Sequence, residues 1–286
     1  MSMKTRTPFG VREFVPEEAQ IHRDLVKKTA SVFEKNGYHF IRTPTFEYYD
    51  TLSEGMETSL KEQAIRFFDN EGHLLVLRPD HTTPIARLVA SRMREYPLPL
   101  RLYYLAPVFR NPKGDGQEIE IFQAGLELIG SPEPQGDAEI IRICIKTIQA
   151  LGYKKFGIDI GHSDFLKEIP LKKRDALLKK DYISYGRLPE RGGIDLAQDH
   201  PSLRSLYREL EKEKLHSYIS FNKGLVKDLR YYSGLMFECY IEGFRESVVS
   251  GGRYDDLIAK FGKKSPSVGF AINMNSLMKN RLIKTN

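Results

Sequence analysis

The sequence predicts an α+β fold in which helices flank an antiparallel sheet. The first observation is the stretch 225–257, where two β-prone runs, 231–244 and 246–250, follow one another and end on Gly251-Gly252. This composition is typical of neighbouring antiparallel strands whose backbone bends or closely approaches another group at the glycines. The second observation is a strand, loop and strand pattern over 100–130. Helices flank these antiparallel elements, which favours α+β over a parallel doubly wound sheet.

The N-terminal half is predicted to contain helices and short strands. Pro16 and the two glutamates after it open a helix, because proline suits the first turn and acids favour the N-terminal end of the helix dipole. Gly37 is placed to end this helix. The predicted elements are a helix from Pro16 to Gly37, a strand over 38–44, two strands around a turn at 70–72, a helix after Asp80, a strand over 100–110 interrupted by Pro107, and a strand over 118–130.

The C-terminal half is predicted to continue this arrangement around an irregular segment. The run 137–151 is a strongly apolar helix, and 156–160 is a short strand. Between 163 and 218 the pattern becomes helical and basic, with breaks at prolines. We therefore expect one core domain over residues 1–286, interrupted by a helical insertion subdomain at 163–218, and a further helix that begins near Asp255.

Composition limits the classes of protein to which the chain can belong. With 286 residues and 41% apolar content, it is long enough for a substantial core, and no run has the length of a membrane helix. The N-terminus lacks the apolar segment of a secretory signal, and Cys144 and Cys239 lie in apolar runs without metal-like spacing. We expect buried free thiols and a cytoplasmic protein. The net charge of +6 is modest and does not by itself decide whether nucleic acid binds. The basic segments are interleaved with Asp and Leu and lack the aromatic residues that stack bases, so nucleic-acid binding is not expected.

Two segments carry a family resemblance. LVKDLRYYSGLMFE and GGRYDDL resemble the histidine-specific segments of class II histidyl-tRNA synthetases and of their non-catalytic relative, the regulatory subunit of ATP phosphoribosyltransferase. The spacing of Gly37, Ile41 and Pro44 is similar to the first class II motif, and the pattern over 100–130 to the second. The resemblance spans nearly the whole chain. It implies a class II synthetase-like antiparallel sheet and a homodimer formed through the helix and strand of the first motif.

The same resemblance implies a pocket for free histidine. An amino acid of this kind presents an ammonium, a carboxylate and an imidazole, which need an anion, donors or a cation, and oriented polar or aromatic groups. The matching residues are Asp80 for the ammonium with Thr82 beside it, Arg110 for the carboxylate, Gln123 and Glu127 along the amino-acid side of the pocket, and Tyr231 and Tyr232 around the imidazole.

Each of these residues also has an ordinary structural interpretation. Asp80 fits a cap for the helix that follows it. Arg110 fits an ion pair within a hairpin, and Glu127 fits the solvent face of a strand. The tyrosine pair fits ordinary core and surface positions. The joint appearance of these residues in the order of the family favours the ligand pocket.

The nucleotide side of a synthetase site is not preserved in the same way. A polyphosphate undergoing displacement needs cations around it. Pro112 stands where the family has a glutamate, Ser276 stands where the third motif has an arginine, and Lys227 replaces a catalytic arginine and loses its planar fork. We therefore expect no enzyme activity, no catalytic residue, no metal site and no cofactor.

The resemblance implies the following function. The chain ends at Asn286, soon after the third motif, so no anticodon-binding domain is expected. The chain would be a catalytically silent regulatory subunit, which activates the short-form ATP phosphoribosyltransferase catalytic subunit and allows feedback inhibition by L-histidine in the first step of histidine biosynthesis. Two alternatives remain open. One is a truncated ligase that forms histidyl-adenylate with Arg253 as its cation, and the other is a tRNA-binding protein on the same fold.

Overall fold

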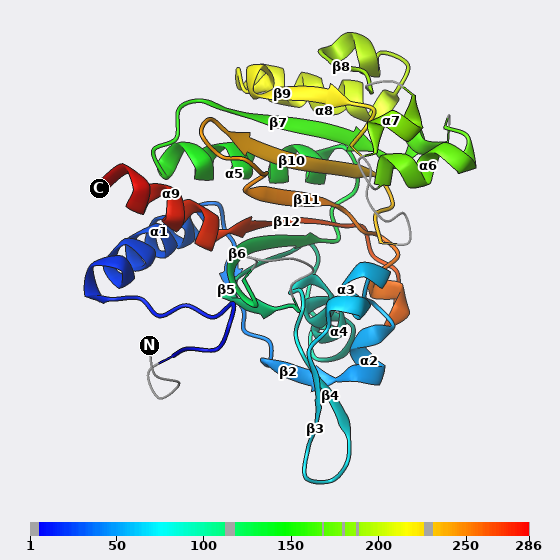
Figure 1. The fold of residues 1–286 in the computed structure, drawn as a ribbon. Coiled ribbons are helices and arrows are strands. Elements are labelled where there is room, and N and C mark those ends of the chain that lie inside the picture. The colour runs from blue at the N-terminus through cyan, green and yellow to red at the C-terminus, as the bar shows by residue number, and fades with distance from the viewer. Residues whose placement is uncertain are drawn as a thin grey trace.

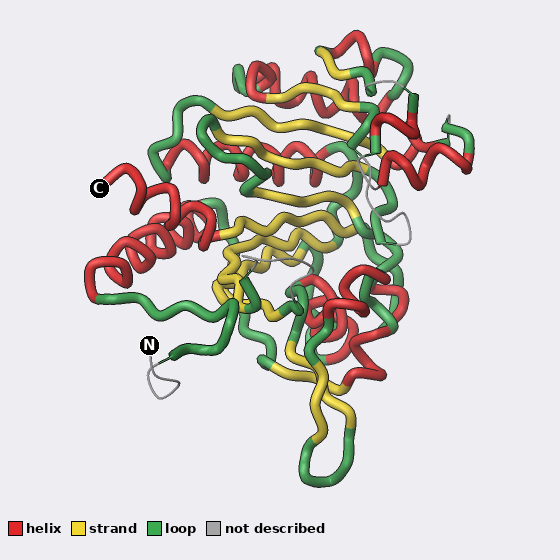
Figure 2. The backbone as a smooth tube through the Cα atoms, in the orientation of Figure 1, coloured by secondary structure: helices red, strands yellow, loops and turns green. Residues whose placement is uncertain are grey.

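The computed structural model describes residues 6–111, 118–167, 169–178, 181–186, 189–225 and 231–285. Within these residues the strands form a large sheet and a smaller one (Figure 1). Figure 2 shows the strands of the large sheet side by side as one layer. In the order in which they pair, these strands are β1 (His39–Phe40), β5 (Leu100–Phe109), β6 (Glu120–Ile129), β12 (Ser267–Asn273), β11 (Val249–Arg253), β10 (Leu235–Ile241), β7 (Phe156–His162), β9 (Ile219–Asn222) and β8 (Arg191–Gly192).

The large sheet is antiparallel through its centre. Neighbouring strands from β5 to β7 pair antiparallel, and parallel pairing occurs between β1 and β5 and between β7 and β9. Strands β10 and β11 pair with Met236 opposite Gly252. The predicted α+β fold with a largely antiparallel sheet is therefore confirmed.

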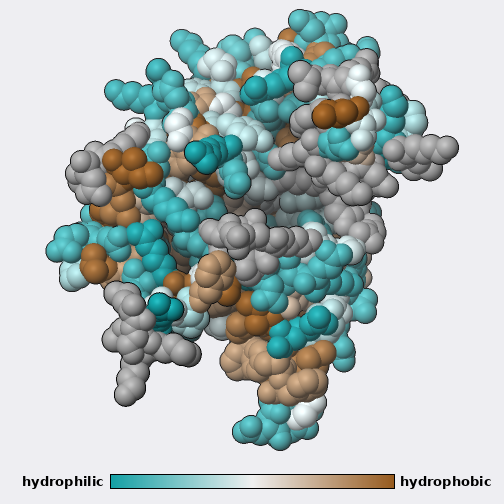
Figure 3. All heavy atoms as spheres, in the orientation of Figure 1, coloured by the Kyte–Doolittle hydropathy of each residue, from teal (hydrophilic) through white to brown (hydrophobic). Residues whose placement is uncertain are grey.

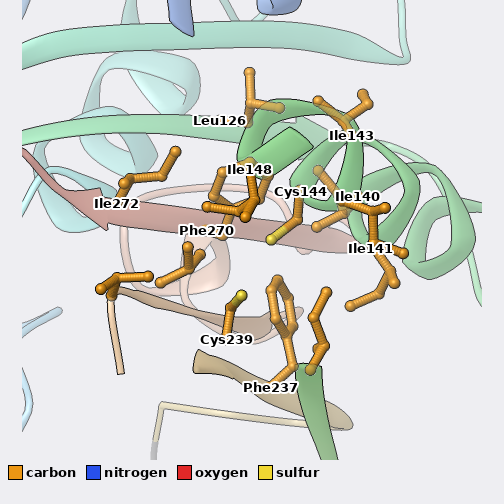
Figure 4. Packing of buried hydrophobic residues seen from close by; sticks show 14 of the residues in the cluster. Leu126, Ile140, Ile141, Ile143, Cys144, Ile148, Phe237, Cys239, Phe270 and Ile272 are labelled. Carbon is orange, nitrogen blue, oxygen red and sulfur yellow. The ribbon is translucent and has the colours of Figure 1, made fainter. Parts of the chain in front are cut away.

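The main core lies between the large sheet and a layer of helices. Helix α5 packs against β12, and α1 packs against α5 and α9. Isoleucines of α5 meet Phe237 and Phe270 of the sheet (Figure 4). Cys144 and Cys239 lie in this core as buried free thiols, as the sequence predicts, and burial raises the pKa of the Cys144 thiol. The helices of this layer are α1 (Pro16–Lys35), α5 (Gln135–Ala150), α8 (Pro201–Lys212) and α9 (Met274–Thr285).

A second cluster covers the opposite face of β5. Tyr103 packs in the main core, whereas Leu102 and Tyr104 contact Ile85 and its neighbours on α4, because successive side chains of a strand alternate between faces. Beside this cluster lies the small sheet, in the order β2-β4-β3. The elements of this region are β2 (Phe46–Tyr48), α2 (Tyr49–Ser53), α3 (Thr58–Gln63), β3 (Arg66–Phe68), β4 (Leu74–Leu77) and α4 (Thr82–Ser91).

The segment 163–218 contains short helices and one strand. Strand β8 pairs antiparallel with β9 and so extends the large sheet. The interpretation of this segment as an inserted subdomain remains a prediction. Its elements are the 3-10 helix η2 (Ser163–Leu166), α6 (Leu171–Leu178), α7 (Tyr182–Tyr185), β8, η3 (Ile194–Ala197), α8 and η4 (His216–Tyr218).

Four local expectations differ from the structure. Strand β5 runs through Pro107 without interruption, because the Pro107 carbonyl points away from β6 and accepts a hydrogen bond from Arg78 Nε (2.8 Å), so the missing N–H breaks no bond to β6. The strand expected over 38–44 is reduced to β1. The glycine pair lies inside β11 rather than beyond its end, and the helix expected near Asp255 is a turn followed by the 3-10 helix η5 (Ile258–Lys260).

In the described part of the chain, the helices are too short or too polar to cross a membrane.

Candidate functional site

A cavity of about 910 Å³ opens over β6, β12 and β11, on the face of the large sheet that α4 also covers. Helix α3 forms one wall and the tyrosine pair another. The structure brings most of the predicted site residues to this cavity, although they come from four separate segments of the chain. The predicted residues that line it are Asp80, Thr82, Arg110, Gln123, Tyr231 and Tyr232.

Asp80 lies at the start of α4 and serves two purposes. Its Oδ1 accepts a hydrogen bond from the Thr83 backbone N–H (2.7 Å), and its Oδ2 accepts one from the Thr83 hydroxyl (3.1 Å). The interpretation as a helix cap is therefore confirmed. The same carboxylate lines the cavity, and each of its oxygens has a second lone pair for a ligand. Burial raises the pKa of Asp80, and the bonds from Thr83 and the nearby Arg110 act in the opposite direction.

Glu127 lies beneath the cavity rather than along its wall. Its side chain is buried, so the interpretation as a solvent-facing residue is wrong. Oε1 accepts a hydrogen bond from Thr82 Oγ1 (2.8 Å), and Oε2 accepts one from the Tyr254 hydroxyl. Burial raises the pKa of Glu127 to about 8, although both hydrogen bonds lower it. Glu127 therefore reaches the cavity through Thr82 and Tyr254, which both line it.

The tyrosine pair is held against the glycines of β11. The rings of Tyr231 and Tyr232 meet edge to face with centroids 4.9 Å apart. A methyl group added at Gly252 would lie 2.7 Å from the Tyr232 ring and 2.5 Å from the Leu235 carbonyl oxygen. The prediction that the backbone approaches another group closely at the glycine pair is confirmed, and the group is the aromatic wall itself.

Arg110 follows β5 directly and places a guanidinium beside Asp80. Its Nε donates a hydrogen bond to the Pro79 carbonyl (2.7 Å), which fixes the side chain at the cavity. Burial lowers the pKa of Arg110, and the carboxylates of Asp80 and Glu57 raise it. An Arg110 guanidinium in this position can form a charge-assisted contact with an anionic group in the cavity.

The described residues that line the cavity carry an excess of negative charge. Arg110 is the cation among them, because burial lowers the pKa of His81 to about 3 and keeps that ring neutral. The carboxylates among them are those of Glu57, Glu62, Asp80 and Glu238. A ligand with a positive group suits this lining better than a triphosphate does.

Arg253, the cation considered for a ligase, does not line the cavity. Its guanidinium is fully buried and donates to Asp137 Oδ1 (2.7 and 2.9 Å) and to Asp255 Oδ1 (3.1 Å). Burial raises the pKa of Asp137 to about 7, against the effect of this ion pair. The group is part of the interior structure, where it joins β11 to the start of α5.

Polar residues of the third motif attach α9 to the sheet. Asn273 Oδ1 accepts the Ser276 backbone N–H (3.1 Å), and Asn275 Oδ1 accepts the Phe122 backbone N–H (3.1 Å). Asn275 Nδ2 donates to the Glu120 carbonyl (3.0 Å). Asn273 also lines the cavity. Two other positions considered for the nucleotide side, Pro112 and Lys227, lie outside the described residues.

Comparison with known proteins identifies the family. A family model described as histidyl-tRNA synthetase matches residues 10–182 and 186–277. The ATP phosphoribosyltransferase regulatory subunit of Acetivibrio thermocellus is 34% identical over 96% of this chain and 76% of its own length. The regulatory subunit of Desulforamulus reducens is 36% identical over 94% of this chain and 77% of its own length. The chain belongs to the ATP phosphoribosyltransferase regulatory subunit family.

Solved structures agree with membership of this regulatory subunit family. A crystal structure described as an ATP phosphoribosyltransferase regulatory subunit/histidyl-tRNA synthetase from Bacillus halodurans has a TM-score of 0.88 and 28% identity, and it covers 98% of this chain and 84% of that one. Apo histidyl-tRNA synthetase from S. aureus has a TM-score of 0.73 at 22% identity, over 96% of this chain and 69% of that one. The second likeness shows the shared fold alone.

Sequence reasoning missed several residues of the site in this member of the family. Tyr254 lies within GGRYDDL, so a search of the recognised segments for hydroxyl groups would have found it. Glu238 similarly ends the segment LVKDLRYYSGLMFE. Glu57 gave no signal, because α3 reaches the cavity through tertiary packing that no local pattern encodes.

Proposed function

We propose that this chain is a non-catalytic subunit that binds L-histidine in the cavity and regulates a short-form ATP phosphoribosyltransferase catalytic subunit in the first step of histidine biosynthesis. The observation that carries the proposal is the charge of the lining, where carboxylates outnumber the guanidinium of Arg110 among the described residues. Such a lining favours a ligand with an ammonium group and a single carboxylate. The names of the relatives support the regulatory role.

Each part of histidine has a matching group in this proposal. Asp80 takes the α-ammonium, with Thr82 beside it, and Arg110 takes the carboxylate. The imidazole lies between the aromatic wall and the polar residues of β6. The residues around the imidazole are Tyr231 and Tyr232, with Gln123 on the cavity wall and Glu127 acting through Thr82 and Tyr254.

The proposal includes the absence of ligase chemistry. Adenylate formation needs cations around the triphosphate. Ser276 stands where the synthetase motif has an arginine, and Arg253 is engaged by carboxylates in the interior. Replacement of synthetase residues by Pro112 and Lys227 adds support from the sequence. The regulatory subunit then acts by binding alone.

Regulation requires histidine to distinguish two states of the complex. A difference in its affinity for the two states of about 1–3 kcal/mol is typical of such coupling.

The proposed assembly lies in the cytoplasm and contains a homodimer of this chain, formed through α1 and β1. Phe40 on β1 is 53% exposed, and Figure 3 shows a further apolar area over the small sheet, where Phe46 and Phe68 are exposed.

The experiment that tests the proposal has two parts. Calorimetry should show one histidine per chain, and imidazole propionate, which lacks the ammonium, should bind much more weakly. Mixing the chain with a short-form catalytic subunit should raise its activity, and histidine should then inhibit the mixture. Histidine binding without any activation would remove the regulatory role, whereas activation without binding in the cavity would place the effector elsewhere.

The two alternatives give different results. Histidine-dependent pyrophosphate exchange above background would indicate a ligase. Steeply salt-dependent binding of tRNA would indicate a nucleic-acid-binding protein.

A further inference from the structure

Three potential metal ligands meet at the carboxyl end of β7, away from the cavity. His162 is the last residue of β7, Asp164 lies in η2, and His200 caps the start of α8. His200 Nε2 is 3.1 Å from His162 Nδ1 and 3.1 Å from Asp164 Oδ2, and the last two atoms are 3.5 Å apart. These three atoms therefore form a nearly equilateral triangle.

The size of this triangle suits a tetrahedral transition metal. Zn²⁺ binds imidazole nitrogen and carboxylate oxygen at distances that place neighbouring ligand atoms about 3.3 Å apart. Two imidazoles with one carboxylate form a donor set that Zn²⁺ accepts, with a further position left for water. The observed separations of 3.1, 3.1 and 3.5 Å require little movement of the side chains.

The protons at the cluster show what a metal ion would have to replace. His162 Nδ1 accepts the Asp164 backbone N–H (3.1 Å), and His200 Nδ1 accepts the Leu203 backbone N–H (3.4 Å). These bonds assign the proton of His200 to Nε2, so a single proton is shared between His162 Nδ1 and Asp164 Oδ2. A metal ion that binds all three atoms takes the place of this proton, which moves to His200 Nδ1, and the two backbone hydrogen bonds are lost.

The orientation of His162 is consistent with a ligand. The ring is buried, and its Nε2 has no hydrogen-bond partner within the described residues. A buried polar atom without a partner costs free energy, so the contacts that favour a histidine side chain at position 162 are those made by its Nδ1. Asp164 and Glu133 add negative charge around the ring.

We propose that His162, Asp164 and His200 form a binding site for a divalent transition metal, with Zn²⁺ as the ion that its chemistry fits best. The ion would join the end of β7 to η2 and to the start of α8. It would therefore fix the irregular segment 163–218 to the large sheet. The backbone N–H of Ser163 donates to the Gly234 carbonyl (3.0 Å), so the site also adjoins the segment that carries the tyrosine pair.

The test uses the full chain after removal of metals with a chelator, in buffer free of histidine. Zn²⁺ alone is titrated in competition with a chromogenic chelator, and Co²⁺ is used to record the visible absorption of a tetrahedral site. We expect one ion per chain and a higher melting temperature with Zn²⁺. His200→Asn should weaken Zn²⁺ binding by more than about 100-fold, because it removes a direct ligand. Asparagine preserves the helix cap, so the fold is retained.

Two further variants separate a metal site from a hydrogen-bonded cluster. Lys167 Nζ holds Asp164 Oδ1 at 2.6 Å in a largely exposed ion pair, and Lys167→Ala should change Zn²⁺ affinity by no more than about 10-fold because it removes no ligand atom. His39 is exposed on β1, and His39→Asn should leave binding unchanged. Zn²⁺ affinity equal in wild type and His200→Asn, or binding only at millimolar concentration, would overturn the site. So would a loss of affinity in Lys167→Ala as large as that expected for His200→Asn, whether or not His200→Asn folds.

Discussion

On one side of the cavity hydrogen bonds from Thr83 hold the Asp80 carboxylate at the lining, whereas on the other side the Asn273 amide is used to cap α9. Thr82 connects the first side to Glu127, and Asp80 is fixed by Thr83. On the other side Asn273 caps α9. The two sides share strands β6 and β12, so the difference arises from side chains and not from the fold.

The difference shows how a synthetase-like cavity can keep one ligand and lose another. The Asp80 carboxylate is already fixed by Thr83, so a cationic group that binds there forms an ion pair without further ordering of that side chain. The opposite wall offers carboxylates such as Glu238 where a triphosphate would need cations.

The largest effect is expected at Arg253, which belongs to neither side. Arg253→Ala leaves Asp137 and Asp255 without their cation in the interior, and the free energy of unfolding should fall by about 3–5 kcal/mol. Urea denaturation measures this change. As a control, Arg12→Ala breaks the exposed pair with Glu18 and should cost at most about 1 kcal/mol. A stable Arg253→Ala variant that has lost histidine binding would instead place this guanidinium in the cavity.

The next largest effect is expected on histidine affinity, at Asp80. Asp80→Asn removes the charge opposite the proposed ammonium, and histidine affinity should fall by more than about 100-fold. Asparagine is a good helix cap, so the melting temperature should change little. Asp80→Ala should also lose binding, but with about 1 kcal/mol of stability lost because the bonds to Thr83 are gone. Unchanged affinity by calorimetry in Asp80→Asn would show that the ammonium lies elsewhere.

Much of the fold could be predicted because local patterns encode it. Helix α1 begins at Pro16 as expected, and its apolar face buries Leu25 and Phe33. The pairing of β10 with β11 follows from adjacent β-prone runs. Continuity of β5 at Pro107 could not be predicted, since it depends on which way one carbonyl points relative to β6.

The candidate site could be predicted only as far as the family segments reached. Asp80 and Arg110 were found because recognised motifs contain them. The burial of Glu127 under Thr82 and Tyr254 depends on three segments meeting, which no spacing along the chain reveals. For the same reason, the cluster of His162 with His200 could not be predicted from the sequence.

A smaller effect is expected in the pH dependence of stability, at Glu127. Its folded pKa of about 8 lies above its ordinary value of 4.5, so the folded state favours the protonated carboxyl. The stabilisation is complete below about pH 4.5 and is lost as the pH rises through 8. Between pH 5 and 7, the free energy of unfolding of the wild type should therefore fall by about 2 kcal/mol more than that of Glu127→Gln. Asp137 titrates in both proteins and cancels in the comparison, and parallel curves from urea denaturation would contradict this assignment.

The smallest effect is expected at Glu238, a carboxylate of the same cavity on the β10 side. The Tyr240 hydroxyl donates to its Oε2 at 2.5 Å, and Glu238 is only partly buried. If the ammonium binds at Asp80, Glu238→Gln should change histidine affinity by no more than about two-fold, because solvent screens the remaining interaction. Calorimetry on this variant is the matched control for Asp80→Asn, since each removes one carboxylate from the lining. A loss in Glu238→Gln as large as that in Asp80→Asn would mean that the ligand spans both walls, and the distinction between the two sides would then have to be abandoned.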